Sequence, residues 1–201
     1  MKKDSSNILP YDFYQRSNVL EVAKDLLGKV LCTAFEGDLC KGRIIEVEAY
    51  NGKNDKACHA NKGRRTARTE IMYKEGGCGY VYLCYGIHHL FNVVTNTKNN
   101  ADAVLIRALQ PIVGMDVMTK RLKSNNKKLT NGPGILSKSM AITTQHTGIF
   151  LGQPPIWIEE GDVIVNTDIV ETTRIGVGYA EEDALLPWRF YMKDNPWVSK
   201  K

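Results

Sequence analysis

Apolar residues recur at two different spacings in the first fifty positions of the chain. Between residues 18 and 27 they fall three or four apart, which is typical of an amphipathic helix, and Gly28 follows where a helix end favours glycine. Residues 29–35, KVLCTAF, predict a strand. A turn is expected over residues 36–41, and the alternation of apolar and polar residues in GRIIEVEAY predicts a second strand over residues 42–50.

The rest of the chain predicts more strands and two helices. Residues 79–86 and 89–97 indicate a pair of antiparallel strands that turns at Gly86. Strands that follow one another in sequence, with a few helices after them, favour an α+β fold with a mostly antiparallel sheet. The other predicted elements are an apolar strand over residues 103–109, helices over residues 111–122 and 131–142, and strands over residues 156–160, 162–170 and 174–178.

The length of the chain favours a single domain. It has 201 residues and a mass of 22.6 kDa, so we expect one compact domain over residues 1–201, with residues 1–17 a loosely packed N-terminal segment. No run reaches the roughly 18 apolar residues of a membrane-spanning helix, and the first residues lack the apolar stretch of a signal peptide. The five cysteines are odd in number and form no CxxC pair, which predicts reduced thiols. We expect a soluble, cytoplasmic protein without membrane contact.

The charged residues are distributed unevenly. Residues 41–74 hold nine basic and four acidic residues, and residues 114–139 hold six and one, whereas residues 159–194 hold three and nine. A fold that gathers the two basic segments on one side has the charge pattern of a polyanion-binding protein. Two ordinary solvated faces produce the same counts, so charge alone leaves both interpretations open.

One strand carries candidate acid–base groups. Glu46, Glu48 and Tyr50 are two residues apart, which places them on one face of the predicted strand. Neighbouring carboxylates raise one another's pKa, so one of them is a candidate general base, and His59 follows after a short polar loop. The alternative is a strand with one solvated face, which alternates polar and apolar residues in the same way.

Aromatic residues and one arginine are the other candidates. Tyr80 and Tyr82 face one side of their predicted strand and Tyr85 the other, which fits a base-stacking pocket and a wedge at a hairpin tip; ordinary sheet packing is the alternative. Arg107 interrupts an apolar run and requires a carboxylate or phosphate partner, or closes a structural ion pair. The chain has no Walker, GxGxxG, GxSxG or HExxH motif, and no metal site is expected.

Several stretches taken together resemble the alkyladenine, or 3-methyladenine, DNA glycosylase family. The resemblance runs in order from about residue 26 to residue 199. It implies a single curved, mostly antiparallel sheet with flanking helices and a protruding β-hairpin. The motifs that carry it are GRIIEVEAY, ACHANKGRRTAR, GYVYLCYG, FNVV, VLIRALQP, GPG and RFYMKDNPWVS.

The resemblance implies a monomeric, monofunctional repair enzyme that flips a damaged purine out of double-stranded DNA and hydrolyses its N-glycosidic bond without metal or cofactor. It implies Glu48 as the general base that activates water. Arg107 and the backbone carbonyl of Ile175 are implied as further contacts of that water.

Other residues receive binding roles from the same resemblance. Tyr50 and Tyr82 are expected to sandwich the base, with His59 hydrogen-bonded near its edge or sugar. Asn92 is expected to reject undamaged guanine by crowding its amino group. The residues implied at the DNA itself are Tyr85 as the wedge, Ile87 and His88 beside it, and Arg64 and Arg68 along the backbone.

Two other functions stay open at this point. One is a catalytically silent DNA-binding or damage-sensing module on the same fold. The presence of Glu48 and Arg107 together argues against it, because a protein that only binds DNA needs neither residue. The other is a nucleosidase that acts on free nucleosides. The basic segments argue against it, because a small neutral substrate does not require them. Salt dependence separates the last two, because only duplex binding weakens steeply as salt rises.

Overall fold

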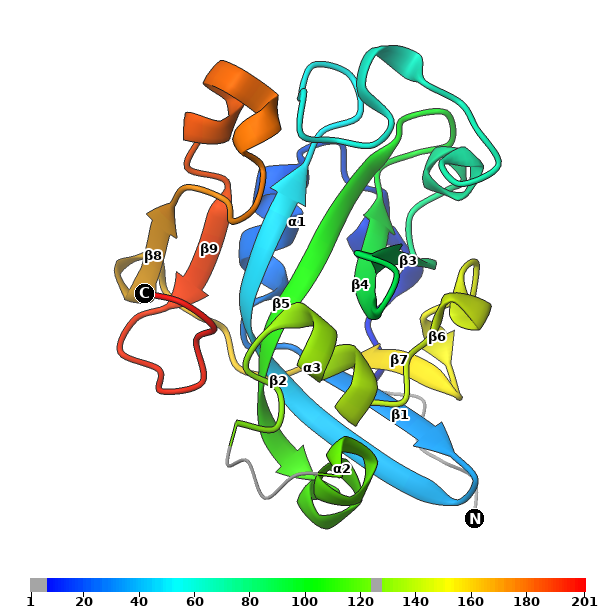
Figure 1. Cartoon of the computed structure of the whole chain (residues 1–201), viewed down its shortest axis with the longest axis vertical. Helices are drawn as coiled ribbons and strands as arrows, with labels where there is room; N and C mark the ends of the chain where they lie inside the picture. Colours follow the sequence, from blue (N-terminus) through cyan, green and yellow to red (C-terminus); the bar gives the residue numbers. More distant parts are fainter. Residues whose placement is uncertain (1–6, 124–127) are drawn as a thin grey trace.

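The fold is built on one antiparallel sheet that curls around the centre of the molecule (Figure 1). The structure is a computed structural model that describes residues 7–123 and 128–201. The main strand order is β3-β4-β5-β2-β1-β7-β6, with β9 pairing to both β2 and β8. The strands are β1 (Val30–Phe35), β2 (Asp38–Tyr50), β3 (Gly79–Cys84), β4 (His88–Thr95), β5 (Asp102–Val113), β6 (Gly152–Gln153), β7 (Ile156–Glu159), β8 (Ile169–Thr172) and β9 (Arg189–Met192).

The helical elements cover and connect this sheet. Most of them are short, and several are single 3₁₀ turns. The expected α+β class with a mostly antiparallel sheet is therefore confirmed. The α-helices are α1 (Val19–Leu26), α2 (Met115–Leu122) and α3 (Pro133–Ser139), and the 3₁₀ helices are η2 (Tyr11–Gln15), η3 (Asn61–Gly63), η4 (Glu70–Tyr73), η5 (Thr144–His146), η6 (Asn166–Asp168) and η7 (Gly178–Leu185).

Strand β2 is the centre of the sheet and changes partner along its length. It pairs with β5 on one side throughout, and on the other side it pairs first with β1 and then, from Glu46 to Glu48, with β9. Side chains alternate along a strand. Val47 and Ala49 therefore join the core with α1, whereas Glu46, Glu48 and Tyr50 face the side that carries the functional site.

Local sequence determines the ends of helix α1. The side chain of Asn18 accepts hydrogen bonds from the amides of Leu20 and Glu21, which stabilises the first turn. The apolar stripe that predicted this helix is buried. After the helix, Gly28 adopts a positive φ of 85°, and the predictions of helix α1 and strand β1 are confirmed within one residue at each end.

Two predicted boundaries are wrong because strand pairing outweighs local preference. Strand β2 begins at Asp38 rather than residue 42, since a two-residue turn at Glu36 and Gly37, both with positive φ, suffices to reverse the chain. The helix predicted from residue 111 begins at Met115, because residues 111–113 continue β5 against β2. Two further predictions are wrong as well: residues 162–165 and 174–177 lie in loops rather than strands, and Gly178 begins η7.

Two side chains of the N-terminal segment are buried. Residues 1–6 lie outside the described part of the chain. From there on, Leu9 and Tyr14 are only 2% and 1% exposed, and the amide of Leu9 bonds to the carbonyl of Ile158. Leu9 and Tyr14 therefore anchor this segment to the main core, whereas Tyr11 between them is 41% exposed. No helix in the described residues is long and apolar enough to cross a membrane.

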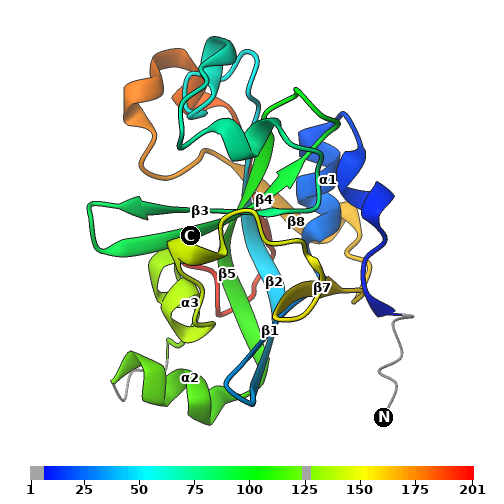
Figure 2. The ribbon, with the colours of Figure 1, turned by 90° about the vertical axis from the view of Figure 1, so that its right-hand side faces the viewer.

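Strands β3 and β4 pair in register from Gly79 opposite Val93 to Cys84 opposite His88. Tyr85 and Gly86 at the turn both have positive φ, of 51° and 72°. Figure 2 shows the turn end of this pair extending beyond the neighbouring elements. The pair therefore links the inner sheet, at Tyr80 and Asn92, to an exposed tip.

We predict that Gly28→Ala destabilises the fold more than Gly37→Ala does. Both glycines have a φ near 85°, which costs other residues about 1–2 kcal/mol. At Gly28 an added Cβ would also lie 2.2 Å from the carbonyl oxygen of Asp162, whereas at Gly37 nothing lies within 4 Å. Urea unfolding of the two variants measures the difference, and equal losses of stability would contradict the close contact.

Candidate functional site

Glu48 lies in the middle of the site and is fully buried. The Tyr50 hydroxyl donates to its Oε2 at 2.7 Å, and the Ile175 amide donates to its Oε1 at 2.7 Å. Arg107 Nη1 lies 3.2 Å from the same Oε1. Burial and the neighbouring Glu48 raise the pKa of Tyr50 well above its ordinary value, so the phenol stays protonated and donates its hydrogen bond.

Glu46, the other carboxylate of the same strand face, has a different environment. It accepts from Arg107 Nε at 3.0 Å, from Arg189 Nη1 at 2.9 Å, and from the amide and hydroxyl of Ser199 at 2.6 and 2.8 Å. Four donors occupy this carboxylate, which favours a structural role. Of the two glutamates considered as a general base, Glu48 is therefore the remaining candidate.

Arg107 connects the two carboxylates. The partner predicted for it is a carboxylate or a phosphate, and the structure provides two carboxylates, those of Glu46 and Glu48. Burial opposes the charge of Arg107, but Glu48 and Glu46 outweigh this effect and its pKa is raised. Glu46 holds one side of the Arg107 guanidinium, and the other side faces Glu48. Arg107 also lines the adjoining cavity.

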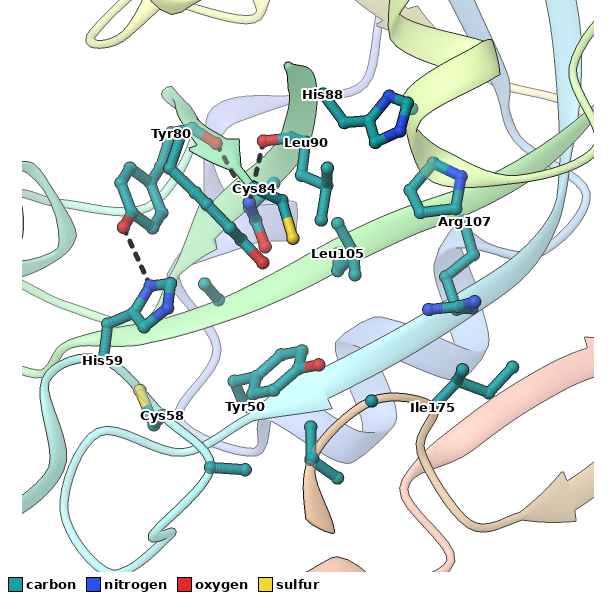
Figure 3. Close-up of a pocket in the computed structure, with 18 of the residues that line it drawn as sticks. Tyr50, Cys58, His59, Tyr80, Cys84, His88, Leu90, Leu105, Arg107 and Ile175 are labelled. Atoms are coloured by element: carbon teal, nitrogen blue, oxygen red, sulfur yellow. Dashed lines mark hydrogen bonds between the residues drawn. The ribbon is translucent and has the colours of Figure 1, made fainter. Parts of the chain in front are cut away.

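A cavity of about 480 Å³ is lined by the three partners of Glu48, Tyr50, Arg107 and Ile175, whereas Glu48 itself does not line it. Figure 3 shows Tyr50, Arg107 and Ile175 at one end of it and His59 and Tyr80 at the other. The walls are mostly aromatic and aliphatic, which suits a flat, largely apolar ligand. Of the residues predicted for the site, the cavity is lined by Tyr50, His59, Tyr82, Tyr85, His88, Asn92, Arg107 and Ile175.

Asn92 has a fixed orientation in the wall of this cavity. Its Nδ2 donates to the carbonyl oxygens of Tyr80 and Leu90 at 3.1 and 3.3 Å, and the residue is only 3% exposed. These two bonds use both amide hydrogens. The side chain therefore has only its carbonyl oxygen to offer a ligand.

His59 belongs to a hydrogen-bonded group with Tyr80 and Arg68. Its Nδ1 lies 2.9 Å from the Tyr80 hydroxyl, and Arg68 Nη2 lies 3.2 Å from its Nε2. The same Arg68 Nη2 also lies 3.5 Å from Nδ1, so the guanidinium contacts both ring nitrogens. Burial, followed by the charges of Arg68 and Arg64, lowers the pKa of His59 to about 4, so His59 is neutral at pH 7.

The exposed residues of the site lie around its rim. Tyr85 is 90% exposed at the hairpin turn and Ile87 is 72% exposed beside it; Ile87 does not line the cavity. Arg64 and Arg68 line a second cavity, of about 520 Å³, which shares His59 with the first. The structure therefore brings the predicted base-binding residues together, and the main cavity is not lined by Glu48, Ile87, Arg64 or Arg68.

The basic and acidic segments are not segregated as the charge pattern indicated. Lys41 and Lys56 of the first basic segment form ion pairs with Glu159 and with Glu181 and Glu182 of the acidic one. Arg43 likewise pairs with Asp162. Much of the local charge excess is therefore neutralised within the molecule. Within residues 7–123 and 128–201, no three histidine, cysteine or acidic residues are grouped closely enough to hold a metal ion.

Sequence reasoning missed part of the site. Arg174 supports the cavity from outside its wall, and the Ile175 loop was predicted as a strand. The one signal for Arg174 in the sequence was its charge, because it stands within a predicted strand that is otherwise apolar. The amide of Ile175 bonds to Glu48, whereas the water contact expected of its carbonyl stays a prediction.

Comparison with known proteins identifies the family. The model of the family described as Methylpurine-DNA glycosylase (MPG) matches residues 12–196. The chain belongs to this family. This glycosylase is therefore a DNA-repair hydrolase that acts on N-glycosyl bonds of DNA, and the family resemblance inferred from its motifs is confirmed.

The glycosylase is also similar to curated relatives that are provisionally named 3-methyladenine DNA glycosylase. One from Clostridium botulinum is 45% identical over 96% of this chain and 100% of its own length. One from Chlamydia felis is 46% identical, with the same coverage. A third, from Methanocella arvoryzae, is 45% identical over 96% of both chains.

We predict that Arg68→Gln raises the pKa of His59 from about 4 toward its ordinary range. Removing a neighbouring positive charge favours the imidazolium, although burial continues to hold the pKa down. Titration of the four histidines by NMR measures the shift. Arg65→Gln is the control, because Arg65 instead contacts Tyr73 and Glu70, and equal shifts in both variants would contradict the pairing of Arg68 with His59.

Proposed function

We propose that this glycosylase excises alkylated purines from double-stranded DNA as a monomeric, monofunctional enzyme, with water activated by Glu48. One observation carries the proposal. Glu48 is held by Tyr50, Arg107 and the Ile175 amide, and these three residues line an aromatic cavity. A carboxylate offers about four lone-pair sites. Tyr50 occupies one site on Oε2, and we propose that the attacking water takes the second.

The reaction requires attack of that water on C1′ of the flipped nucleotide. The water gives a proton to Glu48, the new C1′–O bond forms, and the N-glycosidic bond breaks with its electron pair passing to the purine. Arg107 stabilises the ionised carboxylate and helps to hold the water. The backbone carbonyl of Ile175 is proposed as a further contact of the water.

The cavity supports a preference for alkylated bases. Alkylation at N3 or N7 makes a purine cationic and a good leaving group, and the rings of Tyr50 and Tyr82 attract a cation through their faces. Hypoxanthine and ethenoadenine are neutral and require a proton donor. With a pKa of about 4, His59 carries no extra proton at pH 7, so 3-methyladenine and 7-methylguanine fit this site better than the neutral lesions.

The rim residues support base flipping. Tyr85 is placed to enter the base stack in place of the flipped nucleotide, with Ile87 and His88 beside it. Arg64 and Arg68 are proposed to lie along the phosphate backbone. Asn92 is proposed to reject undamaged guanine by limiting the space beside its amino group, because its own hydrogen bonds hold it in the cavity wall.

Glu48→Gln tests the catalytic role. We expect the excision rate to fall by at least about 100-fold, the scale of general acid–base catalysis, with lesion binding retained. The assay is strand nicking by hot alkali after incubation with duplexes that carry one alkylated purine or one hypoxanthine, with EDTA present. Cleavage by the wild type alone supports the proposal.

Three outcomes of the nicking and binding measurements would contradict it. Loss of lesion binding in Glu48→Gln would assign the residue a structural role. Tight, salt-sensitive binding by a wild type that cleaves neither duplex would indicate the silent damage-binding module instead. Nicking without alkali would rule out monofunctional chemistry.

Tyr85→Ala tests the wedge. An aromatic ring stacked in DNA contributes about 1–3 kcal/mol, so we expect affinity for lesion duplex to fall about tenfold, with a smaller effect on excision at saturating DNA. Tyr85→Phe keeps the ring and is the matched control. Affinity unchanged in both variants, measured by fluorescence anisotropy, would overturn the wedge assignment.

A further inference from the structure

A buried ion pair lies directly behind the cavity. Arg174 Nη1 and Nη2 bond to the two carboxylate oxygens of Asp55 at 2.5 and 2.8 Å. Both side chains are 0% exposed, and neither lines the cavity. This pair therefore acts on the site only through the residues that it holds.

Arg174 contacts three parts of the site at once. Its Nη1 donates to the carbonyl oxygen of Ala49 at 2.9 Å, and its Nη2 donates to that of Asp183 at 3.0 Å. Its guanidinium also lies over the ring of Tyr50, 4.8 Å from the centroid. Arg174 thus ties the end of β2 to η7 and backs the aromatic wall of the cavity.

Asp55 extends this arrangement into the loop that carries His59. Its Oδ1 accepts from the amide of Ala57 at 2.9 Å, and its Oδ2 accepts from the amide of Asn51 at 3.4 Å. The start of the polar loop is therefore folded around one carboxylate. Any change in the position of Asp55 is transmitted to both the loop and Arg174.

The position of these contacts in the chain relates them to Glu48. Ala49, which Arg174 holds, lies between Glu48 and Tyr50, and Ile175, which donates to Glu48, directly follows Arg174. Two of the groups around Glu48, the Tyr50 hydroxyl and the Ile175 amide, therefore depend on one guanidinium. A buried ion pair contributes little net stability compared with apolar residues of similar size, so stability alone does not account for it.

We infer that the Arg174–Asp55 pair is a positioning device for catalysis, which holds Tyr50 and the Ile175 amide in the places that Glu48 requires. The inference rests on the proposed role of Glu48 as the base. Arg174 and Asp55 touch neither the reacting atoms nor the base. Their effect is on the excision step rather than on DNA binding, because Tyr85, Arg64 and Arg68 lie in other parts of the site.

Arg174→Lys and Asp55→Asn test the inference without removing either side chain. Lysine keeps the charge but cannot form the bidentate pair or stack its flat group on Tyr50. Asparagine keeps the shape and one acceptor. For each variant we would measure melting temperature, affinity for a duplex with one 7-methylguanine, and the single-turnover excision rate from pH 5 to pH 9.

We expect the excision rate of both variants to fall at least tenfold, with affinity within about threefold of the wild type. The acid side of the rate–pH profile should also move to higher pH, because a carboxylate that loses hydrogen-bond donors is protonated more readily. A purely structural role does not move this profile. Lys41→Gln is the control, since it removes a partly buried ion pair with Glu159 that lines neither cavity.

Three results would overturn the inference. Excision within twofold of the wild type in both folded variants would show that the pair is dispensable. A loss of rate that is matched by the loss of affinity or melting temperature, with an unmoved pH profile, would show a merely structural role. A wild type that excises nothing would overturn the proposed function itself. The wild-type reaction separates this outcome from the first two, because both of those require an active wild type.

Discussion

Two adjacent carboxylates buried on the central strand impose the main constraint on this molecule. Glu46 and Glu48 are both fully buried on one face of β2, where an ionised group that lacks partners is very unfavourable. The fold supplies those partners from segments distant in sequence. Arg107 comes from β5, Arg189 from β9, Ile175 from a loop and Ser199 from the C-terminal segment.

This constraint explains why one glutamate is structural and the other is suited to chemistry. Glu46 meets four donors and joins β2, β5, β9 and the C-terminal segment. Glu48 meets fewer, and its neighbours Tyr50 and Ile175 also line the cavity. The same strand therefore provides an anchor for the fold and, two residues on, the carboxylate that we propose as the base.

Sequence reasoning was strongest where local rules decide the structure. Helix α1 has its own cap, and β3 and β4 are joined by a tight turn, so both could be predicted from neighbouring residues. It failed at residues 111–113 and 174–178, where pairing with β2 or contact with Glu48 decides the conformation. Alternation along β2 correctly placed Glu48 and Tyr50 together. It could not show that Asp55 and Arg174, 119 residues apart, meet behind them, because nothing local in sequence encodes that contact.

The central claim is that Glu48 holds the attacking water beneath a base stacked between Tyr50 and Tyr82. The most direct measurement is a crystal structure of the enzyme with a duplex that contains a non-cleavable analogue of an alkylated purine nucleotide. The account predicts an ordered water that hydrogen-bonds to Glu48 Oε2 and faces C1′, with the base between the two tyrosines. A flipped base bound elsewhere, or a C1′ that no water held by Glu48 can reach, would contradict it.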